Sequence, residues 1–197
     1  MFEPNSSETH QKRREEERYL TQLHVAARDG STEFAKQLIH MGETKDFGNS
    51  GIVNRQDKNG AAALHYAAFY ARTDMLEFLL KHGAKVNIQD SNGKSPLHSA
   101  GHEACKMLVE RKARLNVRDK AGWTPLHAAA AVDDAKTARL LIKMQADIDA
   151  PSNLGWAPIH VAARYDSQSV ISALIAAECN VLLRTNDLHL ALELSLD

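Results

Sequence analysis

The chain has 197 residues, enough for one domain or a short array of repeats with a hydrophobic core. Its 24 Lys and Arg residues against 25 Asp and Glu residues give a formal net charge of -1, so nothing in the overall charge attracts nucleic acid or an anionic membrane. Every apolar run is far shorter than the ~20 residues of a membrane span, and we expect no membrane-spanning helix.

Residues 1–15 are polar and charged, and we expect them to be a disordered or helical lead-in. They hold no apolar core of a secretion signal, so we expect a cytoplasmic or nuclear protein, with secretion as an effector into another cell left open. Lys-Arg-Arg at 12–14 is a weak nuclear-import candidate, but three glutamates follow it, which favours a solvated charged helix. Cys105 and Cys179 form no CxxC spacing, which fits a reducing compartment.

From residue 16 onward the sequence repeats itself. A Leu-His or Ile-His pair recurs at spacings of 41, 33, 29 and 33 residues, and a second apolar stretch with helical spacing follows each pair. Each unit is therefore predicted to be two helices and a polar connector, and no unit can bury its apolar faces without its neighbours. The recurring histidines are His24, His65, His98, His127 and His160.

This spacing divides the chain into five units and a partial sixth. The first unit is eight residues longer than the 33-residue spacing, and the excess lies in 43–53. We expect this segment to be a mobile surface loop, most simply a tolerated insertion. The third unit is four residues short after Ala100, so about one helical turn is missing. The sixth is either a short cap or the start of a chain that continues past Asp197. The predicted boundaries are 16–56, 57–89, 90–118, 119–151, 152–184 and 185–197.

The start of each first helix follows a rule that the fourth unit obeys best. Thr124 is a preferred N-cap, and Pro125 suits the first helical position. His127 then occupies the third position, where a side chain can reach back to the cap, and we expect it to be neutral and structural. Ala62 and Ala157 replace the capping residue in two other units, and each missing cap costs roughly 0.5–2 kcal/mol.

The ends of the second helices vary more than their starts. Gly42 and Gly83 are suited to the left-handed conformation that ends many helices. Lys112, Gln145 and Glu178 replace them in later units, so those helix ends lack the residue that adopts this conformation freely.

Motifs for catalysis and for metal binding are absent from the sequence. There is no nucleophile elbow, phosphate loop, dinucleotide loop or zinc-protease signature. His98 and His102 stand four residues apart, a spacing that zinc can use, but no further ligands complete a site. We therefore expect no catalytic residue, no metal and no cofactor.

The chain resembles the ankyrin repeat family over nearly all of residues 16–197. DSNGKSPLHSA (90–100) and DKAGWTPLHAAA (119–130) carry the opening motif of that family, and LLKHGAKVNIQD (79–90) matches its second-helix ending. The resemblance implies an all-α solenoid of stacked helix-turn-helix repeats joined by β-hairpin turns. It also implies a concave face, built from hairpin tips and first helices, that generally binds other proteins.

The resemblance further implies which positions on that face vary. They are the two residues before the turn glycine, the one after it, and the fourth and fifth after the motif histidine. Both tryptophans follow a turn glycine, and Trp and Tyr are frequent binding hot spots, so we expect exposed anchors. The alternative is that each indole packs on the neighbouring hairpin. The predicted partner-binding residues are Phe69, Tyr70, Lys94, Lys120, Trp123, Trp156, Arg164 and Tyr165.

These observations favour a non-catalytic protein-interaction module, a scaffold or adaptor, that is monomeric and binds a protein partner. One alternative is the targeting arm of a larger enzyme or secreted effector whose catalytic region lies outside this chain. Another is a structural spacer, which the aromatic residues argue against. Residues 112–120 are locally basic, which a solvated helix end explains more simply than a nucleic-acid or acidic-partner patch.

Overall fold

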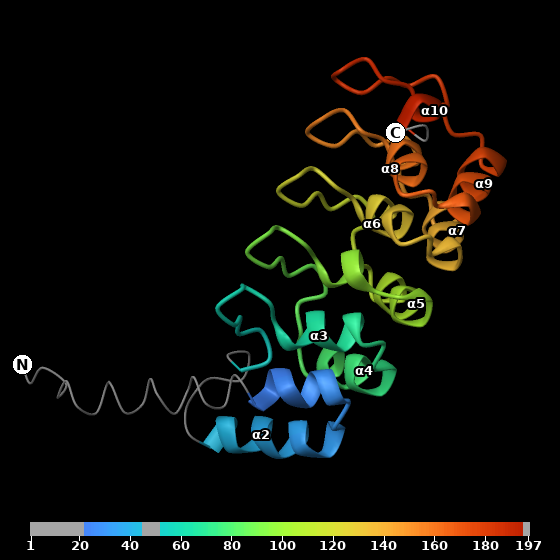
Figure 1. Cartoon of the computed structure of the whole chain (residues 1–197). Helices are drawn as coiled ribbons and strands as arrows, with labels where there is room; N and C mark the ends of the chain where they lie inside the picture. Colours follow the sequence, from blue (N-terminus) through green and yellow to red (C-terminus); the bar gives the residue numbers. More distant parts are fainter. Residues whose placement is uncertain (1–21, 45–51, 195–197) are drawn as a thin grey trace, which may run out of the picture.

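The computed structural model describes residues 22–44 and 52–194, which form a linear array of stacked helix pairs (Figure 1). The predicted all-α solenoid is confirmed. The lead-in 1–15 with its Lys-Arg-Arg, residues 45–51 of the predicted loop, and residues 195–197 lie outside the described residues. The pairs are helical residues 22–29 with α2 (Thr32–Thr44), α3 (Ala63–Phe69) with α4 (Thr73–Lys81), the 3-10 helix η1 (Pro96–Ser99) with α5 (His102–Glu110), α6 (Pro125–Ala131) with α7 (Ala135–Lys143), and α8 (Pro158–Arg164) with α9 (Gln168–Ala176), followed by α10 (Ala191–Leu194).

The helices are arranged in layers. The hairpin loops project to the left in Figure 1, the second helices α4, α5, α7 and α9 lie to the right, and the first helices lie between them. Each helix packs on its partner within the repeat and on the equivalent helices of the adjacent repeats. The core therefore runs along the array, and stability is built from contacts between neighbouring repeats. Its fully buried large residues include Leu64, Leu97 and Leu126 of the first helices, and Leu79, Leu108, Leu141 and Leu174 of the second.

The motif histidines join each repeat to the next. In the fourth repeat the Thr124 N–H donates to Nδ1 of His127 over 3.1 Å, and Nε2 of His127 lies 2.8 Å from the carbonyl oxygen of Trp156. The nitrogen that faces a carbonyl must carry the proton, and the nitrogen that accepts from an N–H must not, so the ring is neutral. The same link joins His65 to the Lys94 carbonyl, His98 to that of Trp123, and His160 to that of Leu183.

Each connector closes in a tight hairpin turn around an acidic or hydroxyl side chain. In the fourth repeat Oδ1 of Asp119 accepts from the N–H groups of Ala121 and Trp123, and Gly122 has a φ of +80°. Adjacent tips are joined as well, since the Asn153 N–H donates to the Ala121 carbonyl over 3.0 Å. The hairpin tips thus form a continuous edge along the array.

Most of the predicted irregularities lie where expected, but Gly42 does not end its helix as predicted, because α2 continues to Thr44. Ala62 and Ala157 are the N-caps of α3 and α8, and η1 has four residues where α3, α6 and α8 have seven. His127 reaches back to the cap residue as predicted, because its Nδ1 accepts the Thr124 N–H and also lies 2.8 Å from the Thr124 Oγ1. The residues that replace the terminal glycine are left-handed, with φ values of 64° for Lys112, 70° for Gln145 and 61° for Glu178.

Candidate functional site

Hairpin tips and the C-terminal ends of the first helices form one face of the array, which we call the inner face. Its exposed apolar side chains stand at the fourth or fifth position after a motif histidine. Phe69, at the fourth position, is 62% exposed, and Tyr165, at the fifth, is 57% exposed; Val132 occupies the fifth position in the fourth repeat. The rings of Phe69 and Tyr70 contact each other edge to face, with centroids 4.9 Å apart.

The two tryptophans lie deeper than expected. Both are partly buried and pack against the core, which contradicts the expectation that they are substantially exposed. The indole of Trp123 stacks on the buried ring of His127, with centroids 6.1 Å apart and 22° between the planes. The backbone N–H of Trp156 donates to Oγ of Ser152 over 3.1 Å. The backbone of each tryptophan is thus held by its own hairpin and by the histidine of the preceding repeat, which turns the indole partly onto the stack.

The predicted basic residues are exposed. Lys94 and Lys120 lie in successive hairpin tips, and Arg164 ends α8 beside Tyr165. Lys58 of the second repeat's tip is exposed in the same way. The aspartates that begin these turns, in contrast, are partly buried, and each directs Oδ1 at two backbone N–H groups of its own turn. The tips of the second to fourth repeats therefore present ammonium groups outward.

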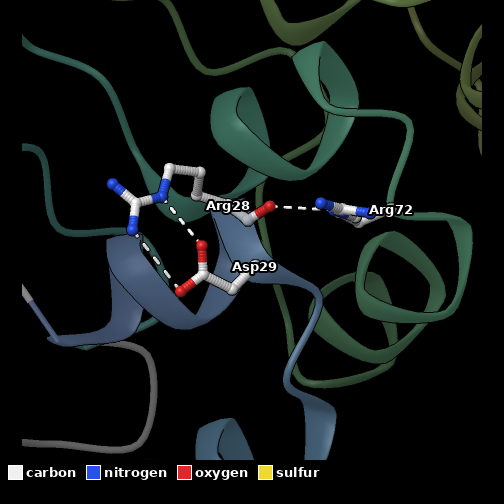
Figure 2. A network of polar contacts seen from close by, with 3 residues as sticks. All are labelled: Arg28, Asp29 and Arg72. Atoms are coloured by element: carbon white, nitrogen blue, oxygen red, sulfur yellow. Dashed lines mark hydrogen bonds and ion pairs between the residues drawn. The ribbon is translucent and has the colours of Figure 1, made fainter.

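At the first repeat the inner face carries an ion pair in place of apolar side chains (Figure 2). Arg28 and Asp29 occupy its fourth and fifth positions after His24, and Nε of Arg28 donates to Oδ1 of Asp29 over 2.8 Å. This hydrogen bond raises the pKa of Arg28 and lowers the pKa of Asp29. Arg72 joins the second repeat to the first, because its Nε donates to the Arg28 carbonyl over 2.9 Å. The apolar part of the inner face thus begins at the second repeat.

A pocket of about 410 Å³ lies beside η1 and brings three of the predicted residues together: Phe69, Lys94 and Trp123. Leu97, Ala100 and Val132 also line it. These three residues were not predicted, although the four missing residues of the third repeat were the signal for a gap at this point. Trp156, Arg164 and Tyr165 are not among the lining residues and belong to the fifth repeat.

One further inner-face residue was missed. Leu154 is 63% exposed in the hairpin tip just before Gly155, where Asn59 and Asn92 stand in the second and third repeats. A large apolar residue at a tip position that other repeats fill with Asn or Ala was the available signal. It adds a second exposed apolar side chain to the fifth repeat, which also carries Tyr165.

The described residues offer little for catalysis. Within 22–44 and 52–194 no three His, Cys, Asp or Glu side chains gather as a metal site would require. Cys105 and Cys179 are buried and unbonded to each other, and burial raises the pKa of Cys105 to about 12, so its thiol is not a nucleophile. None of the helices in these ranges has the length and apolar character needed to cross a bilayer.

Comparison with known proteins places the repeats. A family model for ankyrin repeats (3 copies) matches residues 5–90, 23–119 and 101–185. Protein phosphatase 1 regulatory subunit 12A of Rattus norvegicus is 38% identical over 81 residues, covering 38% of this chain and 8% of that protein. Inversin of Canis lupus familiaris is 36% identical over 83 residues, covering 42% of this chain and 7% of that protein. Potassium channel AKT1 of Oryza sativa subsp. indica is 34% identical over 91 residues, covering 45% and 9%. The chain thus spans less than a tenth of the length of each relative.

Proposed function

The chain belongs to the ankyrin repeat family, whose repeats are protein–protein interaction modules, and from this premise we propose that it binds a protein partner on its inner face. The observation that carries the proposal is the set of exposed apolar side chains at the fourth and fifth positions after the motif histidines. Phe69, Val132 and Tyr165 come from three repeats yet lie on the same face. Large apolar side chains brought together on a surface by a repeating scaffold mark an interaction site.

Binding on this face is preorganised. Histidine links and stacked hairpin tips fix each repeat to its neighbours, so docking orders few additional groups. Phe69, Tyr70 and Tyr165 supply exposed contact area, and Lys94, Lys120 and Arg164 flank them. Trp123 and Trp156 form partly buried walls beside these residues, and we propose that their remaining exposed edges contact the partner. The module itself is non-catalytic, monomeric, and cytoplasmic or nuclear, in agreement with its buried free cysteines.

A second candidate function is that of a targeting arm within a larger protein. The relatives extend far beyond the matched repeats, and one of them is a regulatory subunit of a phosphatase by name. In such a protein the inner face would select the partner, and regions outside this chain would act on it. The mode of docking is the same in both cases.

Site-specific photocrosslinking tests the proposed face. A benzophenone side chain is introduced at Phe69 or Tyr165 on the inner face, and at Phe34 or Ile175 on the second helices as matched exposed controls. After irradiation in cell lysate, we expect protein adducts at the two inner-face positions that are absent or much weaker at the controls. Equal or stronger adducts at Phe34 and Ile175 would place the binding surface on the outer helices and refute the proposal.

A further inference from the structure

The truncated third repeat leaves a pocket in the inner face. Ser99 and Ala100 end η1, and the chain passes directly to Gly101, the N-cap of α5. In the fourth repeat, four more residues (130–133) separate the equivalent Ala129 from Asp134, the N-cap of α7. Where that helical turn is missing, the structure has the pocket of about 410 Å³, within the range of ~300–1,000 Å³ typical of ligand pockets.

The walls of this pocket are apolar and aromatic. Phe69 comes from the second repeat, Trp123 and Val132 come from the fourth, and Leu97 and Ala100 belong to the third between them. Aromatic rings pair favourably with another ring placed edge to face or offset. An aromatic side chain is therefore the occupant that fits these walls best.

Two carboxylates also line the pocket, and both are engaged by the protein. Oδ1 of Asp119 accepts two N–H groups of its own turn. Asp134 accepts the Thr137 N–H at Oδ1 and the Thr137 hydroxyl at Oδ2, over 3.0 and 2.6 Å. The exposed charged side chain among the lining residues is instead that of Lys94, and Lys58 and Lys120 are exposed in the tips on either side. The exposed Asp133 next to the lining residue Val132 accepts the Val170 N–H at Oδ1.

We propose that the pocket receives one aromatic side chain from an extended acidic segment of a protein partner, whose carboxylates pair with Lys94 and Lys120. This inference rests on the proposed docking on the inner face. The tip lysines and the pocket are complementary to such a segment, because Lys58, Lys94 and Lys120 lie in successive tips and the apolar pocket is lined by the middle one, Lys94. A basic segment would meet like charges at the tips of the second to fourth repeats.

The probe for this site is a capped peptide, Gly-Glu-Asp-Glu-Phe-Glu-Asp-Glu-Gly, titrated into the full chain labelled with ¹⁵N. We expect saturable shifts of the amide signals of Phe69, Ala100 and Val132. Replacing the peptide's Phe with Ala should weaken binding by at least about 10-fold, as for a central hot spot. Replacing its acids with Gln and Asn should weaken it severalfold, and added salt should do the same to the acidic peptide.

Two variants of the protein separate the pocket from the rest of the face. Gly101 has an ordinary φ of -68°, and a Cβ added there meets nothing within 4 Å. Gly101→Phe should therefore fold normally, place a ring in the pocket and reduce affinity by about 10-fold or more, whereas Gly101→Ala should bind as the natural protein does. Lys94→Gln with Lys120→Gln should weaken binding about 3- to 10-fold, and Lys106→Gln on α5 should not.

The outcomes distinguish this inference from the proposed function. Binding of the peptide to Gly101→Phe as strongly as to the natural chain would overturn the pocket assignment, and so would the absence of shifts at millimolar peptide. Equal binding of the neutral peptide would overturn the acidic partner. In all three cases, crosslinks confined to Phe69 and Tyr165 would still support docking on the inner face, while their absence would count against the proposed function itself.

Discussion

The motif histidine is a neutral hydrogen-bonding link. His127 is fully buried, and burial lowers its pKa to about 4 from the 6.5 of an exposed imidazole. The pKa values of His65, His98 and His160 are lowered for the same reason. Protonation would place a hydrogen on Nδ1, where the ring now accepts the N–H of the cap residue. A charged ring would thus lose this hydrogen bond and would remain buried without hydration, which disfavours the charged form.

Stability should therefore fall between pH 6.5 and pH 4. In this window the unfolded chain takes up protons that the folded chain does not, so the histidine contribution is complete above pH 6.5 and is lost as the pH drops. His127 alone should remove about 2 kcal/mol from the free energy of unfolding between pH 7 and pH 5. Urea titrations at both pH values measure the change.

The matched variants are His127→Gln, which should reduce this pH dependence by the His127 share and leave that of the other three histidines, and His40→Gln on the exposed surface of α2, which should preserve it. A free energy of unfolding that is the same at pH 7 and pH 5 would contradict the neutral-link assignment.

The cap residue next to the histidine offers a second test at this scale. Thr124 and Ser95 place a hydroxyl 2.8 and 3.0 Å from the ring nitrogen of their histidines, whereas Ala157 offers none to His160. Ala157→Thr should raise the free energy of unfolding by about 0.5–1 kcal/mol, the worth of one hydrogen bond. Thermal and urea unfolding report the gain. Ala157→Val adds the same bulk without the hydroxyl, and an equal gain from Val would attribute the effect to packing.

At the scale of the helix, the left-handed residues after α5, α7 and α9 are a source of strain. Lys112, Gln145 and Glu178 have positive φ, a conformation that costs a residue with a Cβ about 1–2 kcal/mol. Gly83 holds the same place after α4 with a φ of 85°. The helices end identically, but only one of these four ends uses the residue that adopts this conformation freely.

Replacing each of the three by Gly should stabilise the array by about 0.5–1 kcal/mol, because the relieved strain exceeds the entropy that Gly adds to the unfolded chain. Denaturant midpoints of the single and triple variants measure this. The converse change, Gly83→Ala, should destabilise by about 1 kcal/mol, and it isolates the backbone effect because its Cβ would meet nothing within 4 Å. A neutral Gly83→Ala would show that the left-handed turn carries no strain.

Helix starts and ends could be predicted from the sequence because they depend on local chemistry. The Thr-Pro-Leu-His phrase determines where α6 begins, and the same phrase with Ala at the cap still determines α8. The depth of the tryptophans could not be predicted in this way. It depends on the orientation of each indole: that of Trp123 lies on the ring of His127, four residues later in the same repeat, and both indoles pack against the core. The motif does not specify that orientation.

At the scale of the whole molecule, the short third repeat interrupts an otherwise regular stack. Inserting Ala-Ala-Val-Asp, the sequence of 130–133, between Ala100 and Gly101 should restore the missing turn and its contacts with α3 and α6. Because stability in such arrays sums over neighbouring interfaces, we expect a gain of about 1–2 kcal/mol in urea unfolding, together with loss of the acidic-peptide site. A loss of stability would mean that the neighbouring repeats are fitted to the short form.

The deletion was visible in the sequence, but its consequence was not. A missing turn can be closed by movement of the adjacent repeats or left open as a pocket. Which of these happens is decided by packing among three repeats, and no single repeat contains that information. The row of tip lysines is similar: each residue was visible, but their common orientation follows only from the stacked tips.

Three of the histidine links, those of His65, His98 and His127, end on the carbonyl of the residue after the turn glycine, whereas the link of His160 ends on Leu183. The residue after the glycine is Lys94 in one repeat and Trp123 or Trp156 in the next two, and all three carbonyls receive the same bond. Its main chain therefore serves the neighbouring repeat, while its side chain takes no part in that bond. The main-chain carbonyl of this residue thus links two repeats, and its side chain is free to determine which partner binds. Substitutions at these positions can therefore change the binding specificity while the histidine link between the repeats is kept.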